Sequence, residues 1–255
     1  MRGYVIMAQN TSTVNYVECA EVLAMSIRQN NPNANITIIT EDKLPYGDLA
    51  PDSDWKLIND WQVYEASPYD ETIKLEADML VSNNIDYLFD ALSIKDVCIC
   101  TTIRDYKGNI SDSRAYRKFI DNNNLPDVYN AITYFKKSTF AKTFFETVRC
   151  IFENWNDIRP NFKCNVDEPI STDWAYSIAS HVLGVENTTI PTIIRDFSMV
   201  HMKHLIVNTI TEDWTKELVY EIGNPIRIQT IPQTYPFHYH IKPFSKKIIE
   251  YYGRI

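Results

Sequence analysis

Short apolar runs alternate with amphipathic stretches over the first part of the chain. Residues 4–8 read YVIMA, which predicts a buried strand, and residues 16–30 have the spacing of an amphipathic helix. A second apolar strand is predicted at 36–40, after the NPNA turn. Because a strand, helix, strand succession favours parallel pairing through a right-handed crossover, the pattern predicts an α/β fold with a mainly parallel sheet.

The alternation continues through the middle of the chain. Apolar runs predict strands at 72–75, 97–102 and 129–137, and amphipathic spacing predicts helices at 85–92 and 139–154. A further helix should begin at STDWAYS, with Ser171 or Thr172 as its N-cap. The polar segment that follows Thr102, through Asn124, is a candidate lid or acceptor loop. The C-terminal third has short strands and several prolines, and we expect acceptor choice to depend on it and on residues 104–127. The chain has no internal repeat. Its length suits one large domain or two small ones, and we expect one domain over residues 1–255.

Composition supports a globular chain that needs no disulfides. With 255 residues, 45% of them hydrophobic, the chain can bury a sizeable core. The five cysteines include no Cys-x-x-Cys pair, which favours reduced, buried thiols over a disulfide framework or a zinc knuckle. The apolar run near the start is too short for a signal peptide or a membrane span. We therefore expect a cytoplasmic protein with no membrane partner.

The net charge of -8 argues against a protein that wraps nucleic acid by bulk attraction. Two segments could still form a local basic patch, although we favour a solvated surface for clusters of this size. Their members are Arg104, Lys107, Arg114, Arg117 and Lys118 in the middle of the chain and Lys242, Lys246, Lys247 and Arg254 near its end.

An acidic pair follows the apolar strand predicted at 72–75. In extended backbone Glu76 and Asp78 would point to one face, where two carboxylates can share a divalent cation. Hard oxygen ligands suit Mg²⁺ or Mn²⁺. Taken alone, such a pair is more often a solvated turn, so its sequence context decides the interpretation.

The sequence around this pair resembles a known family. TIKLEADMLVSNNIDYLFDAL is similar to the Asp-x-Asp region of GT-A fold glycosyltransferases, especially the glycogenin and galactosyltransferase-like family 8. SPYDETIK, YNAITYFKKS and TDWAYS resemble other segments of that family, in the same order, over about residues 3–245. A looser resemblance links the opening and the Glu-Ala-Asp triplet to phage glycosyltransferases that modify hydroxymethylated DNA bases.

The resemblance implies a GT-A fold in which residues 1–102 bind a nucleotide sugar and residues 103–255 bind the acceptor. It implies that Asp78 binds Mn²⁺ or Mg²⁺, that Glu76 binds the metal or the donor's ribose, and that Ala77 lies against the donor. The sequence departs from the family in having Glu at the first acidic position, which puts the coordination geometry in question. Lys74, two residues earlier, would neutralise the carboxylates or contact phosphate, with an ordinary ion pair as the alternative.

Ligands of open α/β sheets lie beyond the carboxyl ends of the strands. Together with the resemblance, this rule makes four residues after the first strand candidates for contacts with the donor's base and ribose: Ala8, Gln9, Asn10 and Thr11. The alternative is an ordinary loop from strand to helix, in which Thr11 caps the helix.

In the family, a C-terminal histidine completes the metal site and a nearby lysine binds the diphosphate. The segment FHYHIKPF favours His240 as that ligand, with His238 as an alternative on the same strand face, and Lys242 as the lysine. VHMK offers a competing pair, His201 and Lys203. A histidine is also often only a structural hydrogen-bonding group.

Two further residues are candidates for contact with the reacting sugar. The resemblance places Asp173 near the sugar carbon or the acceptor hydroxyl, and Asn130 near the sugar. Asp173 could instead be an acid that complements the dipole of its helix, and Asn130 could simply close a turn.

The resemblance therefore predicts a metal-dependent glycosyltransferase that moves a sugar, with retention if the family 8 likeness holds, from a UDP-sugar or similar donor to a hydroxyl. The acceptor could be hydroxymethylated cytosine in phage DNA, which would place the protein in the host cytoplasm, or a glycan or protein. Alternatives are a non-catalytic nucleotide-sugar-binding module and a nucleotidyltransferase. The latter is disfavoured because QNTSTV has no glycine. The sequence does not indicate the sugar or the oligomeric state.

Overall fold

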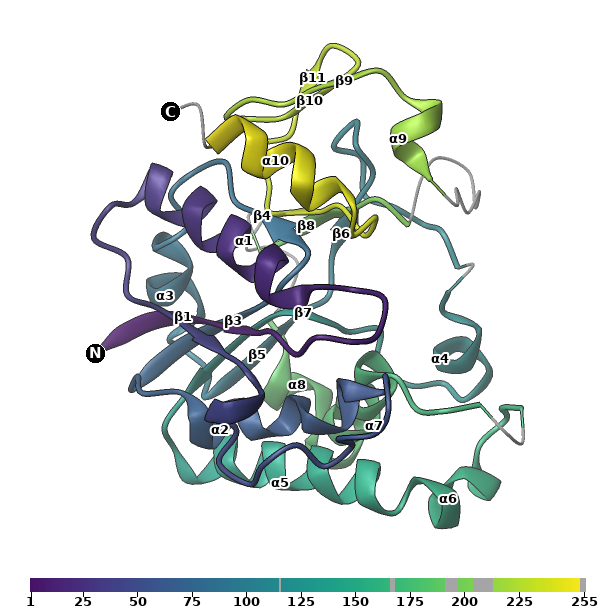
Figure 1. The fold of residues 1–255 in the computed structure, drawn as a ribbon. Helices are drawn as coiled ribbons and strands as arrows, with labels where there is room; N and C mark the ends of the chain where they lie inside the picture. Colours follow the sequence, from purple (N-terminus) through teal and green to yellow (C-terminus); the bar gives the residue numbers. More distant parts are fainter. Residues whose placement is uncertain (115, 166–167, 191–196, 204–212, 253–255) are drawn as a thin grey trace.

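The computed structural model describes residues 1–114, 116–165, 168–190, 197–203 and 213–252 (Figure 1). The strands are β1 (Arg2–Met7), β2 (Ile36–Ile39), β3 (Glu71–Glu76), β4 (Met79–Leu80), β5 (Val97–Cys100), β6 (Ile103–Arg104), β7 (Tyr129–Lys136), β8 (Met199–His201), β9 (Tyr220–Glu221), β10 (Arg227–Ile228), β11 (Ile231–Pro232) and β12 (Phe237–His238). The α-helices are α1 (Tyr16–Asn30), α2 (Val63–Ala66), α3 (Tyr87–Leu92), α4 (Lys118–Asn122), α5 (Thr139–Glu153), α6 (Trp155–Ile158), α7 (Thr172–Leu183), α8 (Val185–Thr188), α9 (Trp214–Glu217) and α10 (Phe244–Tyr252). Short 3₁₀ helices span Glu41–Lys43, Lys56–Gln62 and Arg159–Asn161.

The central sheet has the strand order β2-β1-β3-β7-β5. β1 pairs in parallel with both β2 and β3, whereas β7 runs antiparallel to both β3 and β5. All strands of this sheet except β7 therefore point the same way, which confirms the predicted mixed, mainly parallel sheet. Because β7 lies between β3 and β5, the two halves predicted from the sequence share one sheet.

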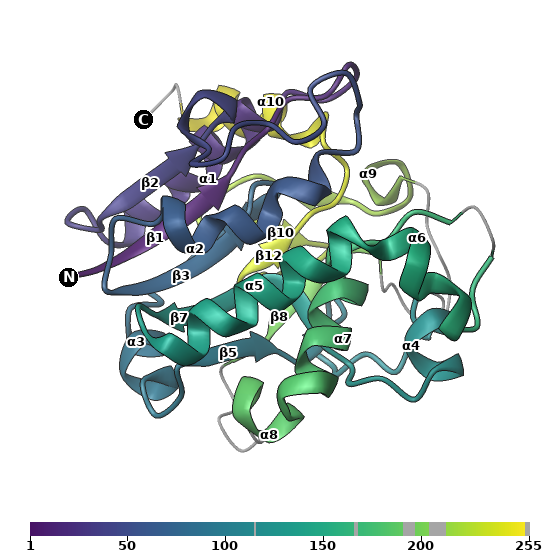
Figure 2. The same cartoon turned by 90° about the horizontal axis from the view of Figure 1, so that it is seen from below.

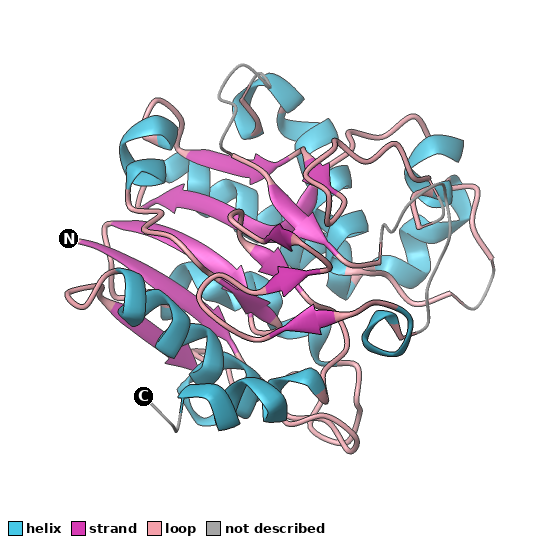
Figure 3. Ribbon diagram, turned by 90° about the horizontal axis from the view of Figure 1, so that it is seen from above, coloured by secondary structure: helices cyan, strands magenta, loops and turns pink. Residues whose placement is uncertain are grey.

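Helices cover both faces of the central sheet (Figures 2 and 3). α1 and α3 pack on one face, in an apolar cluster that includes Tyr4, Ile73 and Leu88. α2, α5 and α7 pack on the other face, around Val5 and Phe135. The sheet is thus the middle layer of a three-layer arrangement, as expected for strands that are apolar on both faces.

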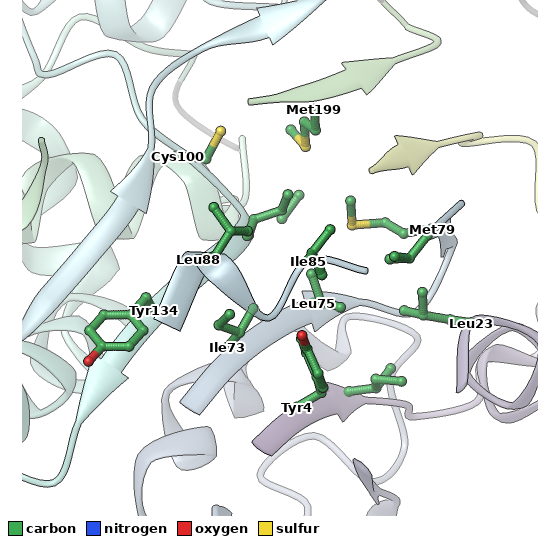
Figure 4. Packing of buried hydrophobic residues seen from close by; sticks show 14 of the residues in the cluster. Tyr4, Leu23, Ile73, Leu75, Met79, Ile85, Leu88, Cys100, Tyr134 and Met199 are labelled. Atoms are coloured by element: carbon green, nitrogen blue, oxygen red, sulfur yellow. The ribbon is translucent and has the colours of Figure 1, made fainter. Parts of the chain in front are cut away.

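Alternation along β3 explains how this strand serves both layers. Ile73 and Leu75 point into the cluster below α1, where they meet Tyr4, Leu23 and Met79 (Figure 4). Successive side chains of a strand point to opposite faces, so Lys74 and Glu76 belong to the other face. The strand therefore anchors its end in the core while it directs polar groups to the opposite side.

A second sheet, of order β4-β12-β8-β6, lies beside the carboxyl end of β3 (Figure 1). β12 pairs with β4 in antiparallel fashion and with β8 in parallel. Its apolar side chains pack with those of α9 and α10 in a separate cluster that contains Trp214, Phe237 and Phe244. This sheet connects the C-terminal part of the chain to the residues that follow Glu76.

Most predicted elements appear within one or two residues of their expected ends. Of the two N-cap candidates for α7 it is Ser171 that caps, since its hydroxyl accepts the N–H of Trp174 at 3.2 Å. The predicted strand at 97–102 ends earlier, at Cys100. All five cysteines are free, but the expectation that they are buried is wrong for Cys150, which is exposed, and Cys164 is half-buried.

Candidate functional site

A pocket of about 420 Å³ lies beyond the carboxyl ends of β1 and β3. It is lined from both halves of the chain, as the rule for open α/β sheets predicts. Its wall includes Met7, Gln9, Thr11, Tyr16, Asp54, Trp55, Lys56, Leu57, Asp60, Lys74, Glu76, Ala77, Asp78, Tyr129, Asn130, Ala131, Ser171, Thr172, Asp173, Met199, His201, Lys203, His238, His240 and Lys242.

The acidic pair stands at a turn rather than in a continuous strand. β3 ends at Glu76, residues 77 and 78 form a turn, and β4 begins at Met79. The prediction that extended backbone aligns the two carboxylates is therefore wrong in its reason, although both carboxylates face the pocket. The turn is fixed from the second sheet, because the N–H of Tyr239 donates to the carbonyl of Asp78 at 3.2 Å.

His238 completes a cluster with the two acids. Its pairing with Met79 across β12 and β4 brings Nε2 to 3.0 Å from Asp78 Oδ2 and 3.5 Å from Glu76 Oε2. One ligand atom from each of the three side chains lies within 4.8 Å of the others. Two carboxylate oxygens and an imidazole nitrogen form a donor set that suits Mn²⁺ or Mg²⁺.

The other two histidines predicted as metal ligands, His240 and His201, lie near this cluster without joining it. His240, the first choice from the sequence, follows the end of β12 and has a positive φ of 63°, so it does not continue the strand. Its ring centre is 6.5 Å from that of His238, and the expected common face is absent. His201 lies in register with His238 on β8, with ring centres 4.3 Å apart. The geometry therefore favours His238, which the sequence offered as an alternative.

Charges near the cluster differentiate the two carboxylates. Burial alone would raise the pKa of Asp78, but the nearby His238 and Lys242 outweigh burial and hold that pKa well below its usual range. Lys242 Nζ lies 2.9 Å from Asp78 Oδ2. Burial raises the pKa of Glu76, because the more distant His238 and the charge of Lys74 do not outweigh it. Asp78 is therefore the more firmly ionised of the pair.

His240 stays uncharged. Burial, followed by the charges of Lys203 and Lys242, lowers the pKa of His240 to about 3. Its Nδ1 lies 3.4 Å from Lys242 Nζ, so a neutral ring can accept a hydrogen bond from the lysine. His240 thus serves as a neutral hydrogen-bond acceptor for Lys242.

Lys74 forms an ordinary ion pair, the alternative expected from the sequence, and its partner is Asp60 rather than Glu76 or Asp78. Its Nζ is 2.5 Å from Asp60 Oδ1 and 5.2 Å from the ring centre of Tyr176. Asp60 in turn accepts the hydroxyl of Tyr176 at 2.6 Å. The side chain of Lys74 is only 1% exposed and is held in this network, and its charge acts on Glu76 by lowering the pKa of that carboxyl.

The loop after β1 divides the predicted donor contacts into two groups. Gln9 and Thr11 line the pocket. Ala8 is instead packed in the core, and Asn10 serves the start of α1, where its Oδ1 accepts the N–H of Val17 at 3.1 Å. The structure therefore brings two of these four residues to the pocket.

Asp173 also lines the pocket, and both of its carboxylate oxygens are engaged. Oδ2 accepts from Arg117 Nη1 at 2.8 Å, and Oδ1 accepts the backbone N–H of Asn130 at 2.9 Å. Arg117 is buried, lies 4.1 Å from the ring centre of Tyr129 and also binds Asp127. This network fixes the start of β7 against the start of α7, and contact of Asp173 with the reacting sugar stays a prediction.

Sequence reasoning missed one wall of the pocket. Residues 54–57, which precede and begin the 3₁₀ helix Lys56–Gln62, line it, as does Tyr16. The indole of Trp55 donates to the carbonyl of Ile170 at 3.2 Å, 115 residues away in sequence. A tryptophan in a polar stretch was the available signal, and it did not indicate which surface the stretch would meet.

The basic segment in the middle of the chain makes internal contacts. Arg114 pairs with Asp121 and Asp127, and Arg117 is buried as described above. Arg104 donates to the Ser198 hydroxyl at 3.0 Å and to a backbone carbonyl. Arg114 and Arg117 are therefore largely neutralised within the protein, whereas these two partners of Arg104 are uncharged. Binding of DNA stays a prediction. Arg254 lies outside the described residues.

Among the helices of the described residues, none is both long and apolar enough to cross a bilayer.

Solved structures identify the architecture around this pocket. The galactosyltransferase LgtC in complex with donor and acceptor sugar analogs matches with a TM-score of 0.54 and 12% identity, over 100% of this chain and 96% of LgtC. An active-site mutant of LgtC gives 0.51 and 14% over the same shares. The chain has the GT-A fold.

The likeness to a longer enzyme is weaker. The bifunctional glycosyltransferase WbbM matches with a TM-score of 0.46 and 14% identity, over 74% of this chain and 38% of WbbM. No protein-family model and no curated protein matches the sequence. The fold is therefore shown, while membership of family 8 stays a prediction.

Proposed function

We propose that this GT-A fold chain is a metal-dependent glycosyltransferase that moves a sugar from a nucleoside-diphosphate donor, in the first instance a UDP-sugar, to an acceptor hydroxyl. One observation carries the proposal: Glu76, Asp78 and His238 converge on one pocket at the carboxyl end of the sheet. The likeness to LgtC, whose structure holds donor and acceptor sugar analogs, supports a sugar-nucleotide ligand for this pocket.

The three residues fit Mn²⁺ or Mg²⁺ in type and in spacing. Such an ion, when bound, would neutralise charge on the leaving diphosphate. Asp78, ionised and buried, would be its firmest ligand, with Glu76 and His238 beside it. Lys242, now paired with Asp78, would be close enough to share the diphosphate.

Two buried amides are suited to bind polar groups of the donor. Within the described residues, Gln9 Nε2 and Asn130 Nδ2 have no hydrogen-bond partner, and both side chains line the pocket. A buried donor group without a partner costs free energy, which a ligand oxygen would recover. Gln9 stands at the end of β1 and Asn130 at the start of β7, so the pair would contact different parts of a bound sugar nucleotide.

The test is turnover by the purified protein with Mn²⁺ and a panel of nucleotide sugars. Acceptors should include simple oligosaccharides and hydroxymethylcytosine DNA, because the acceptor hydroxyl is not specified by the pocket. Release of nucleoside diphosphate that needs both the metal and an acceptor supports the proposal, and chelation by EDTA should abolish it. Binding of the donor without any turnover would instead identify a non-catalytic nucleotide-sugar-binding module.

A further inference from the structure

Two parallel strands bring similar segments to the same wall of the pocket. β8 and β12 pair in register, with Val200 opposite Phe237 and His201 opposite His238. Each strand ends at its histidine, and a lysine follows within four residues, Lys203 after β8 and Lys242 after β12. Because the strand ends lie side by side, both lysines reach the pocket.

The lysines of the pocket differ in what they contact. Lys56, Lys74 and Lys242 each pair with a carboxylate, from Asp48, Asp60 and Asp78 respectively. For Lys203, no carboxylate of residues 1–114, 116–165, 168–190, 197–203 or 213–252 lies within 4.0 Å of Nζ. Its ammonium lies instead 5.2 Å from the ring centre of Tyr116.

An ammonium in a partly enclosed pocket is stabilised when an anion joins it. Lys203 lines the same wall as Lys242, whose own carboxylate partner is a metal ligand in the proposed function. An anion bound beside the acidic turn would therefore face two lysines from two different strands. The aromatic ring of Tyr116 would limit the solvent on one side of Lys203 while leaving its N–H groups able to donate.

We propose that Lys203 is a second diphosphate-binding residue, which together with Lys242 holds the diphosphate of the donor and of the released nucleotide. This inference rests on the proposed function, because the diphosphate is the ligand that the function requires beside Glu76 and Asp78. It gives the segment VHMK a role of its own, in which its lysine rather than its histidine serves the ligand. Lys203 acts here by binding, so its loss should weaken nucleotide affinity as well as turnover.

Calorimetric titration of the full chain with UDP and with inorganic pyrophosphate, each in the presence of Mn²⁺, tests the inference. Lys203→Met should weaken both ligands roughly tenfold or more, because a charge-assisted hydrogen bond is lost, whereas Lys203→Arg should retain most of the affinity. Lys216→Met is the matched control, since Lys216 is exposed and pairs with Asp213, the N-cap of its own helix. Thermal unfolding of each variant identifies any general loss of structure.

The outcomes separate the two proposals. If the wild type binds Mn²⁺ with UDP or pyrophosphate and Lys203→Met binds equally well, the role of Lys203 is overturned while the proposed function stands. If the wild type binds neither ligand, the proposed function itself fails, and this inference with it. Weakened binding in a Lys203→Met protein that unfolds at the wild-type temperature, with recovery in Lys203→Arg, supports the inference.

Discussion

The pocket contains two acidic regions that differ in what holds them. At the acidic turn, the carboxylate of Asp78 contacts the side chains of His238 and Lys242, which can move aside. Elsewhere in the pocket lining, Asp173 is bound by a backbone N–H and by the buried Arg117. The same residue type can thus offer its oxygens to a cation in one place and fasten two elements together in the other. The neighbours of a carboxylate, more than its presence in a pocket, indicate its role.

The largest expected difference is in transfer activity, when the charge of Asp78 or that of Asp173 is removed. Asp78→Asn should lower Mn²⁺-dependent transfer by roughly a thousandfold, because the ion contributes several kcal/mol to the stabilisation of the leaving group. Asp173→Asn keeps the oxygen that accepts from Asn130 and should reduce transfer much less. Initial rates with saturating donor measure the difference. Equal losses would show that both carboxylates serve the metal or the reaction directly.

The fastening role of Asp173 predicts a large effect on stability from its partner. Arg117→Met leaves Asp127 and Asp173 without their buried cation, which should lower the free energy of unfolding by about 3 kcal/mol or more. Arg149→Met is the control, because Arg149 forms an exposed pair with Glu153 that contributes well under about 1 kcal/mol. Denaturant unfolding provides the measurement. An Arg117→Met protein as stable as the control would contradict the role assigned to this network.

A smaller difference in Mn²⁺ affinity is expected between variants of His238 and His240. His238→Gln should weaken Mn²⁺ binding roughly tenfold or more, since it removes a nitrogen that lies beside both carboxylates. His240→Gln should change Mn²⁺ affinity little, because His240 contacts Lys242 instead. Titration followed by electron paramagnetic resonance of free Mn²⁺ distinguishes them. The reverse order would restore the histidine that the sequence favoured.

The smallest expected effect is on the pH dependence of Mn²⁺ binding. Burial raises the pKa of Glu76 above its ordinary value of 4.5, and only the ionised carboxylate can bind a cation. Mn²⁺ affinity should therefore fall as the pH is lowered, beginning at a higher pH than for an ordinary glutamate, while Asp78 stays ionised. Glu76→Gln should bind more weakly overall and lose this part of the pH dependence. An unchanged pH profile in that variant would exclude Glu76 as the titrating ligand.

The sequence predicted the strands and helices well because each element corresponds to its own local run of apolar residues. Ile73 and Leu75 belong to a strand, and the following Glu76 marks its end, so the location of the acidic turn followed from local pattern. The N-cap at Ser171 likewise depends on residues only three apart. Local features of this kind indicate the α/β class and the end of β3, whereas the resemblance to GT-A glycosyltransferases was needed to predict the GT-A fold and to interpret Glu76 and Asp78 as site residues.

The parts that escaped prediction depend on contacts between distant residues. His238 rather than His240 faces the acids because β12 ends at His238 and the backbone then adopts a positive φ. The partner of Lys74 comes from a 3₁₀ helix, and that of Asp173 lies 56 positions away. Residue spacing along one segment carries no information about such pairs.

The reversed direction of β7 has a consequence for how the pocket can vary. Its first residues, Tyr129 and Asn130, stand at the pocket, whereas Lys136 lies at the far edge of the sheet, roughly 23 Å away at strand spacing. A deletion in the connection that precedes β7 would therefore displace Tyr129 and Asn130, which line the pocket. An equal deletion after Lys136 would leave Tyr129 and Asn130 in place. The connection after β7 can therefore change in evolution without altering the pocket.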